Sequence, residues 1–336
     1  MNRRSFLKVA GSTLATLPVL PAVAQLGRTT TMAAGTTARS FTPGRYALEL
    51  DGKVIGWIDS VEGGDAVGQV VEMRNGATPD TARKHIGAVK YEEITITCGL
   101  TVGKEMFDWI ATSLAGKVTR KNGSIIAADY NYKAISSLKF FNALITEIGF
   151  PALDASSKDV AKMTIKFAPE YTRTAKGGQV QPPPGAGIKQ KAWLCSNFKL
   201  TIGGLDCTRV NKIDAIVIKQ IVQNDMVGIT RDPVKVPSHV EIPNLAFTTS
   251  VMGDDDLIAW HEDFVINGRS IAANEKNGSL TLMTPDLRDT LLTINFHSLG
   301  VFKCTPEKME AGADTIGRIR AEMYCNQIDI LPAPTL

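Results

Sequence analysis

Cysteine is scarce in this chain and is never closely paired in the sequence. The 336 residues contain five cysteines, an odd number without a C-x-x-C spacing: Cys98, Cys195, Cys207, Cys304 and Cys325. Such spacing is typical of small core residues, and it argues against a zinc site or a disulfide scaffold. A single disulfide remains an alternative, and the spacing does not select its partners.

Motifs for catalysis and nucleotide binding are also missing. The sequence has no G-x-S-x-G, no P-loop and no G-x-G-x-x-G followed by an acidic residue. Four histidines without H-x-H or H-x-x-x-H spacing are interpreted as surface or packing residues: His85, His239, His261 and His297. We therefore predict a protein that is not an enzyme, with no catalytic residue, no metal site and no cofactor.

Three other groups of residues have weaker chemical interpretations. The acidic run 254–256 lacks the rest of a calcium-binding loop and predicts a helix N-cap. Glu92 and Glu93 are adjacent, so on a strand they would point to opposite faces and share no substrate. Three aromatic residues could form a sugar-binding strip, although core or interface packing is favoured: Trp57, Phe140 and Phe141.

The chain has little excess charge of either sign. Its 37 Lys and Arg residues against 34 Asp and Glu residues give a net charge of +3. This balance gives no electrostatic reason to expect nucleic acid or an acidic membrane as a partner. The hydrophobic content of 44% is that of a globular protein, and 336 residues are enough for two ordinary domains.

The N-terminus, "MNRRSFLKVAGSTLATLPVLPAVAQ", has the pattern of a bacterial twin-arginine signal peptide over residues 1–24. The signal residues are Arg3, Arg4, Phe6, Leu7 and Lys8, and cleavage after Ala24 is indicated by the small residues Ala22 and Ala24. A membrane anchor is the alternative, but the apolar run is interrupted by glycine and proline and is shorter than the ~20 residues of a span. We predict export of a folded protein, without disulfides, to the periplasm or beyond.

Two stretches of low complexity divide the rest of the chain. Residues 25–44 are rich in Thr, Ala and Gly and predict a flexible leader. Residues 176–190, "KGGQVQPPPGAGIKQ", predict a linker that the proline run stiffens. The expected domains are 45–175 and 191–336.

The two segments repeat the same order of predicted elements. "RYALELDGK" and "NFKLTIGGL" each alternate apolar residues before a turn dipeptide, and each is followed by an irregular, variable stretch. A second alternating strand, "EEITITC" or "PNLAFTTSV", comes next. The segments end alike, with the alternating strands "AKMTIKFAPEY" and "GRIRAEMYCNQ". The order predicts a tandem duplication.

Each segment also has one amphipathic helix, and a repeated tetrapeptide follows it. The helices are predicted in "GKEMFDWIATSLAG" and "GDDDLIAWHEDFVING", with Trp109 and Trp260 at matching places. The tetrapeptide "KNGS" occurs at 121–124 and 276–279, and its Asn-Gly pair predicts a tight hairpin turn in both copies. The residues that mark the repeat are Trp109, Trp260, Asn122, Gly123, Asn277 and Gly278. The fold class predicted is mainly β (α+β): two tandem antiparallel β-sandwich or barrel domains, each with one flanking helix.

Several blocks of the first segment resemble the tail tube proteins of phages with contractile tails and of phage-derived injection systems. The blocks are "KHIGAVKYEEITITCGL", "FDWI", "RKNGSIIAADYN" and "FFNALITEIGFPALDASSKDVAKMTIKFAPEYTR". The second segment resembles this family only through its element order, Trp260, KNGS and the closing strand.

The resemblance implies a structural protein similar to Hcp of type VI secretion, in which six domains close into a ring and rings stack into a tube. With two domains per chain, three chains would form a ring with pseudo-sixfold symmetry. The variable loops at 62–88 and 223–240 would reach neighbouring subunits, and sheath or baseplate proteins are possible partners. The alternatives are an exported monomeric β-sandwich that binds a partner, and an exported enzyme with a diffuse site.

Overall fold

A computed structural model describes residues 44–73, 83–100, 102–177, 193–226, 232–252, 254–307 and 316–333. These residues belong to one compact unit, Thr42–Leu336. The predicted signal peptide, nearly all of the leader and most of the predicted linker lie outside the described residues. The boundary between two domains at residues 176–190 therefore stays a prediction.

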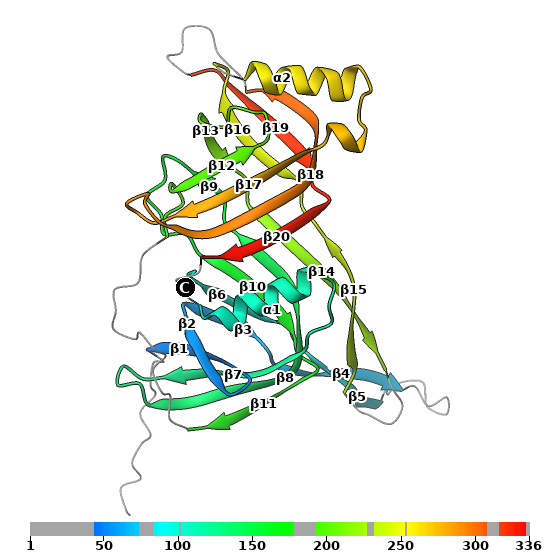
Figure 1. Ribbon diagram of the computed structural model, residues 1–336. Coiled ribbons are helices and arrows are strands. Elements are labelled where there is room, and N and C mark those ends of the chain that lie inside the picture. The colour runs from blue at the N-terminus through cyan, green and yellow to red at the C-terminus, as the bar shows by residue number, and fades with distance from the viewer. Residues whose placement is uncertain are drawn as a thin grey trace, which may run out of the picture. The chain divides into compact units, whose positions relative to one another are not determined.

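The first half is built from strands and one helix (Figure 1). In chain order its elements are β1 (Arg45–Leu50), β2 (Lys53–Ile58), β3 (Ser60–Gly63), β4 (Ala66–Met73), β5 (Arg83–Tyr91), β6 (Ile94–Cys98), α1 (Lys104–Leu114), β7 (Lys121–Ala128), β8 (Ala134–Phe150), β9 (Leu153–Asp154), β10 (Met163–Ala168) and β11 (Tyr171–Lys176).

The second half follows the same plan. Its elements are β12 (Phe198–Ile202), β13 (Val210–Ile213), β14 (Ile216–Asp225), β15 (Val234–Glu241), β16 (Leu245–Ser250), α2 (Asp255–His261), the π-helix η1 (Glu262–Ile266), the 3-10 helix η2 (Ala272–Asn274), β17 (Lys276–Met283), β18 (Thr290–Pro306), β19 (Arg318–Tyr324) and β20 (Gln327–Pro332).

The strand order confirms the predicted mainly β fold and shows that the element plan occurs twice. In the first half the sheet runs β1-β7-β8-β10-β6-β3, and in the second half it runs β12-β17-β18-β19-β16-β13. β11 pairs with β8, and β20 pairs with β18 in the same way. All of these strand pairs are antiparallel.

The structure differs from the expectation in the variable stretches. The predicted loops at 62–88 and 223–240 contain much of two hairpins, β4–β5 and β14–β15. β11 and β20 were not predicted as separate strands. After β12 the chain makes only an isolated bridge between Ile202 and Leu205, where the first half has the full return strand β2.

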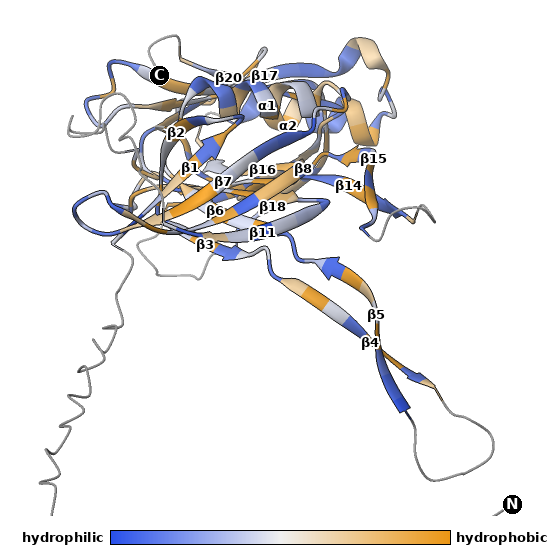
Figure 2. Ribbon diagram, turned by 90° about the horizontal axis from the view of Figure 1, so that it is seen from below, coloured by the Kyte–Doolittle hydropathy of each residue, from blue (hydrophilic) through white to orange (hydrophobic). Residues whose placement is uncertain are grey.

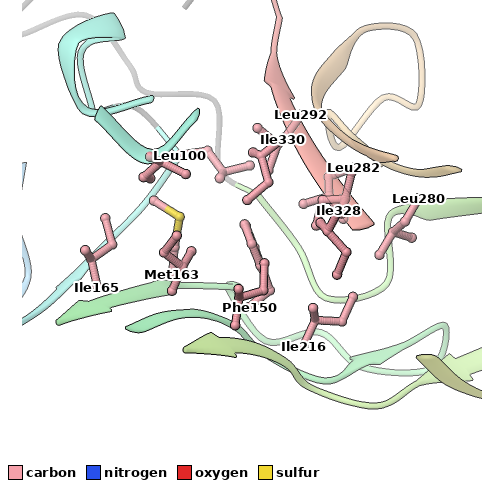
Figure 3. Packing of buried hydrophobic residues seen from close by; sticks show 14 of the residues in the cluster. Leu100, Phe150, Met163, Ile165, Ile216, Leu280, Leu282, Leu292, Ile328 and Ile330 are labelled. Atoms are coloured by element: carbon pink, nitrogen blue, oxygen red, sulfur yellow. The ribbon is translucent and has the colours of Figure 1, made fainter. Parts of the chain in front are cut away.

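One continuous hydrophobic core contains residues of both halves. Alternation along the strands places Ile165 of β10 and Ile330 of β20 in this core, where Figure 3 shows them with Phe150 and Ile216. The two helices bury Trp109 and Trp260, as their periodicity predicts. The predicted Asp254 cap makes no side-chain capping bond, although Asp255 and Asp256 lie in the first turn of α2.

Among the described helices, none combines the length and the apolar character that crossing a bilayer requires.

Candidate functional site: a docked hairpin and its exposed counterpart

The long strand β8 has different neighbours along its two parts. Its first part, near Ser136–Phe141, lies between β7 and β11. Its last part, near Leu144–Phe150, pairs with β10 on one edge and with β14 of the second half on the other. The β14–β15 hairpin thus extends a sheet of the first half.

Four residue pairs define how β14 docks on β8. The antiparallel register places Ile216 opposite Phe150, Val217 opposite Gly149, Ile218 opposite Ile148 and Lys219 opposite Glu147. Ile148 and Ile218 are 2% and 1% exposed, so the contact is apolar at its centre. Figure 3 shows Phe150 and Ile216 close to each other at this junction. Because apolar burial is the main stabilising term in folding, the docked hairpin is part of the core.

The charges on this edge are complementary. Lys166 Nζ lies 2.8 Å from Glu147 Oε1, and Lys219 of β14 is the register partner of Glu147 on the other edge. Opposite charges directly across two strands stabilise the pairing modestly. Glu147 therefore forms an ion pair with a lysine of its own half and lies opposite a lysine of the other half in the strand register.

The second strand of the hairpin is fixed through its backbone. Arg120 Nη2 donates to the carbonyl oxygen of Lys235 at 2.6 Å, and the Lys235 amide donates to Glu170 Oε1 at 3.3 Å. Asn142 Nδ2 donates to the other oxygen of Glu170 at 2.6 Å. Burial lowers the pKa of the Lys235 ammonium, with Lys90 adding to this effect. These contacts hold β15 against the first half.

The strand β18 is as long as β8, and its neighbours β17, β19 and β20 correspond to the neighbours β7, β10 and β11 of β8. The last part of β18, however, has a free edge. In the pairing of β8 with β10, a bulge leaves Thr146 of β8 without a register partner. In the pairing of β18 with β19, a bulge leaves Phe302 of β18 without one, so the two residues correspond. Residues 300–306 pair with β19 on one edge, and no described strand pairs with the other. As a result Phe302 is 39% exposed, whereas Thr146 is 8% exposed.

The hairpin β4–β5 is the counterpart of the docked hairpin β14–β15. Like the last part of β18, it has an edge that no other described strand covers. Its ladder has a bulge between Gly68 and Val70, and the β14–β15 ladder has one between Gln220 and Val222. All eight residues of β4 are exposed, and within the described residues β4 and β5 pair only with each other. Figure 2 shows this hairpin standing clear of the sheets.

The residues that mark the repeat form the same contacts in both halves. Trp109 Nε1 donates to the carbonyl of Thr119 at 2.9 Å, and Trp260 Nε1 donates to the carbonyl of Asn274 at 3.2 Å. Each acceptor lies two residues before the lysine of KNGS. The indole therefore ties the helix to the start of the following strand in each half.

The asparagines of KNGS have a matching role at the kinks in the two long strands. Asn122 Oδ1 accepts from the amide of Asn142 at 2.9 Å, and Asn277 Oδ1 accepts from the amide of Ser298 at 3.0 Å. Asn142 and Ser298 have φ of 50° and 55°, which are unusual for residues other than glycine. The side chain satisfies an amide where the strand changes neighbours.

The prediction of a hairpin turn at KNGS is wrong, because the tetrapeptide begins β7 and β17. The glycines are explained by close backbone approach instead. A Cβ on Gly123 would lie 2.1 Å from the carbonyl oxygen of Glu49, and one on Gly278 would lie 3.0 Å from that of Thr201. Glycine is needed where the neighbouring strand comes this near.

The other sequence candidates do not converge on a reactive site. Phe140 is fully buried, Phe141 stacks on Tyr171, and Trp57 packs on Tyr132, so no shared aromatic strip forms. His297 bonds Asp329, and in the described residues no group of three or more His, Cys, Asp or Glu could hold a metal. The signal residues Arg3, Arg4, Phe6, Leu7 and Lys8, with Ala22 and Ala24, lie outside the described residues.

The residues of the docking contact were not identified from the sequence. The run "IVIKQIVQ" is rich in the β-branched residues Ile and Val, which is a strand signal. That signal could have located β14, but it carries no information about the strand on which β14 docks.

The two halves repeat one strand order, and they differ in that one hairpin is docked within the chain while its counterpart is exposed. Residues 42–173 match the family model described as T4-like virus tail tube protein gp19. This match confirms the resemblance of the first half to tail tube proteins, which are structural. The matched residues include β4–β5 and β8.

Solved structures also resemble parts of this chain. The sheath-tube complex of an extracellular contractile injection system, PVC, shares 24% identity over 42% of this chain and 94% of that chain, with a TM-score of 0.37. Hcp1 from Flavobacterium johnsoniae shares 12% identity over 41% of this chain and 96% of that chain, with a TM-score of 0.25. No curated protein matches the chain.

Proposed function

We propose that this protein is a structural, tail-tube-like component that assembles with copies of itself into rings or a tube. The proposal depends mainly on one observation: one hairpin and one strand edge are joined within the chain, while their counterparts are exposed. A hairpin offered on one side and an edge on another make a head-to-tail contact. Such contacts close into rings or continue as filaments.

The number of chains in a ring follows from the repeat. The tail tube resemblance implies six modules in a ring, and each chain supplies two. We therefore propose a ring of three chains with pseudo-sixfold symmetry and no catalytic role.

Light scattering on the purified full chain, across a range of concentrations, tests self-assembly. We expect a mass three times the 36.2 kDa of one chain, less any processed signal peptide. Negative-stain images of the same sample should show rings or tubes of uniform diameter. A monomer mass at the highest soluble concentration, with dispersed particles, would contradict the proposal.

We also propose export through the twin-arginine pathway, which is supported by the pattern around Arg3 and Arg4. Changing both residues to lysine keeps their charge and should abolish export, measured as protein in the cytoplasmic and exported fractions. Unchanged localisation would contradict this part of the proposal.

Sheath or baseplate proteins of an injection system are the companions that we propose, because tube proteins form one layer of such machines. Co-purification with proteins encoded beside this chain tests the companions. Recovery of the chain alone, from cells that make an injection system, would contradict them.

A further inference from the structure

We propose that the β4–β5 hairpin of one copy adds to the exposed edge of β18 in a second copy, in the register that β14 adopts on β8. The inference rests on the proposed self-assembly, and it specifies the two surfaces and the residue pairs that join them.

The docked hairpin provides the template for this contact. Because the bulges of the two hairpins correspond, Ile218 and Lys219 of β14 correspond to Ala66 and Val67 of β4. Because the bulges of the long strands correspond, Ile148 and Glu147 of β8 correspond to Cys304 and Lys303 of β18. Transfer of the pairing places Ala66 opposite Cys304 and Val67 opposite Lys303.

Both surfaces have features of strands that await a partner. The hairpin exposes five large apolar side chains to solvent: Val67, Val70, Val71, Met73 and Ile86. A hairpin of this kind with a free edge readily pairs with another chain. On β18, the exposed ring of Phe302 provides apolar surface next to the edge.

A second pair of surfaces shows the same asymmetry. Within the chain, α1 of the first half contacts β20 of the second half, and Phe107 of α1 is 1% exposed. The corresponding residue of α2, two positions before its tryptophan, is Ile258, which is 43% exposed. The counterpart of β20 is β11, so the same assembly would bring β11 of a second copy to α2.

Charge favours β4–β5 over β14–β15 as the occupant of the β18 edge. If a second copy docked its β14 there, Lys219 would lie opposite Lys303, and like charges directly across two strands are unfavourable. β4 presents the neutral Val67 at that place. The Lys303 ammonium also lies 3.0 Å from Glu322, so it needs no carboxylate from the partner.

Two glycines set the direction in which the chain enters β4, and the second half has no glycine at the corresponding positions. Gly63 and Gly64 have φ of 82° and 85° and turn the chain just before β4. The corresponding Ala215 and Ile216 lead directly into β14. A Cβ on Gly63 would lie 2.0 Å from the carbonyl oxygen of Glu93, so this turn requires glycine.

Cross-linking through the native Cys304 tests the register. In an Ala66→Cys variant of the full chain, a short bifunctional thiol reagent should join the new thiol at position 66 of one copy to Cys304 of another, giving covalent dimers and trimers on a denaturing gel. Val67→Cys is the matched control, because Val67 follows Ala66 on β4 and adjacent strand residues point to opposite faces, so its product should be much weaker. The Ala66→Cys/Cys304→Ser variant should give no product. Thermal melting checks that the exposed substitutions leave the fold unchanged.

A charge pair at the same place gives an independent readout. Val67→Glu should tighten assembly and Val67→Lys should weaken it, each by about two- to fivefold in the dissociation constant measured by light scattering. Equal effects of the two substitutions would contradict the register. A third outcome is that light scattering shows trimers while the Ala66→Cys variant gives no cross-linked product, or gives one that does not need Cys304. In that case the proposed contact is wrong and self-assembly stands. If neither trimers nor cross-linked products form, both proposals fail.

Discussion

β8 and β18 occupy equivalent places in the two halves, yet their last parts differ in burial and in chemistry. The edge of β8 has Ile148 and Phe150, both buried under the second half. The edge of β18 has Lys303, Thr305 and Pro306, all exposed. Lysine and proline on an edge strand are a known protection against unspecific pairing. The comparison shows that the edge covered within the chain is apolar, whereas the edge left open carries residues that discourage unspecific pairing.

The largest effect that we expect comes from the two helix tryptophans. Trp109 is 1% exposed and packs on Phe167, and Trp260 is 8% exposed and packs on Phe264. Trp109→Ala should lower the free energy of unfolding by about 3–5 kcal/mol, and Trp260→Ala by less. Denaturant titration measures both. Equal losses of unfolding free energy in the two variants would contradict the expectation that the helix of the second half is less well buried than that of the first.

A smaller loss is expected at the docked edge. Ile218→Ala should lower the free energy of unfolding by about 2–4 kcal/mol, because the side chain is fully buried against the first half. Cys304→Ala, at the place on the open edge that corresponds to the docked Ile148, removes a smaller and partly exposed side chain and should cost about 1 kcal/mol or less in the monomer. Denaturant titrations with similar losses for the two variants would remove the distinction between the edges.

The asparagines of KNGS should contribute equally in the two halves. Asn122→Ala and Asn277→Ala each remove a hydrogen bond to an amide at a strand kink, which should cost about 1 kcal/mol. Thermal or denaturant unfolding of the two single variants measures the cost. A loss in only one half would mean that the shared geometry has different importance in the two copies.

The smallest effect is expected at Asp154, which lies in a second contact between the halves. Its strand β9 pairs with β13, and Lys212 Nζ lies 3.3 Å from its carboxylate. The Ser156 hydroxyl, followed by the Ser156 amide and Lys212, lowers the pKa of Asp154. The resulting stability is present at pH above the unfolded pKa and is lost as the pH falls through the lower folded value.

Asp154→Asn should therefore slightly reduce the loss of stability on acidification, and leave a small constant deficit at neutral pH. Unfolding measured at about pH 7 and about pH 3, on either side of the ordinary carboxyl range, tests the sign. A larger acid-induced loss in the variant than in the parent chain would contradict the assignment.

The sequence predicted the repeat well and the contacts between the halves poorly. The alternation in "EEITITC" and the helix period around Trp109 are local patterns, and the strands and helices follow them. KNGS was interpreted as a turn because Asn-Gly favours one, but pairing with β1 and β12 overrides this preference. No local pattern states that β14 docks on β8, since that contact depends on how the two halves pack.

Hydrogen exchange measured at low and high protein concentration tests the central claim most directly. The amides of residues 147–150 should exchange slowly at both concentrations, because β14 covers this edge of β8. Among residues 303–305 and those of β4, the amides that point to the free edge, away from β19 and β5, should exchange rapidly in the dilute chain and become protected, together, as the mass rises. Protection of β8 alone at every concentration, with a rising mass, would contradict the claim that the open edge and the free hairpin join the chains.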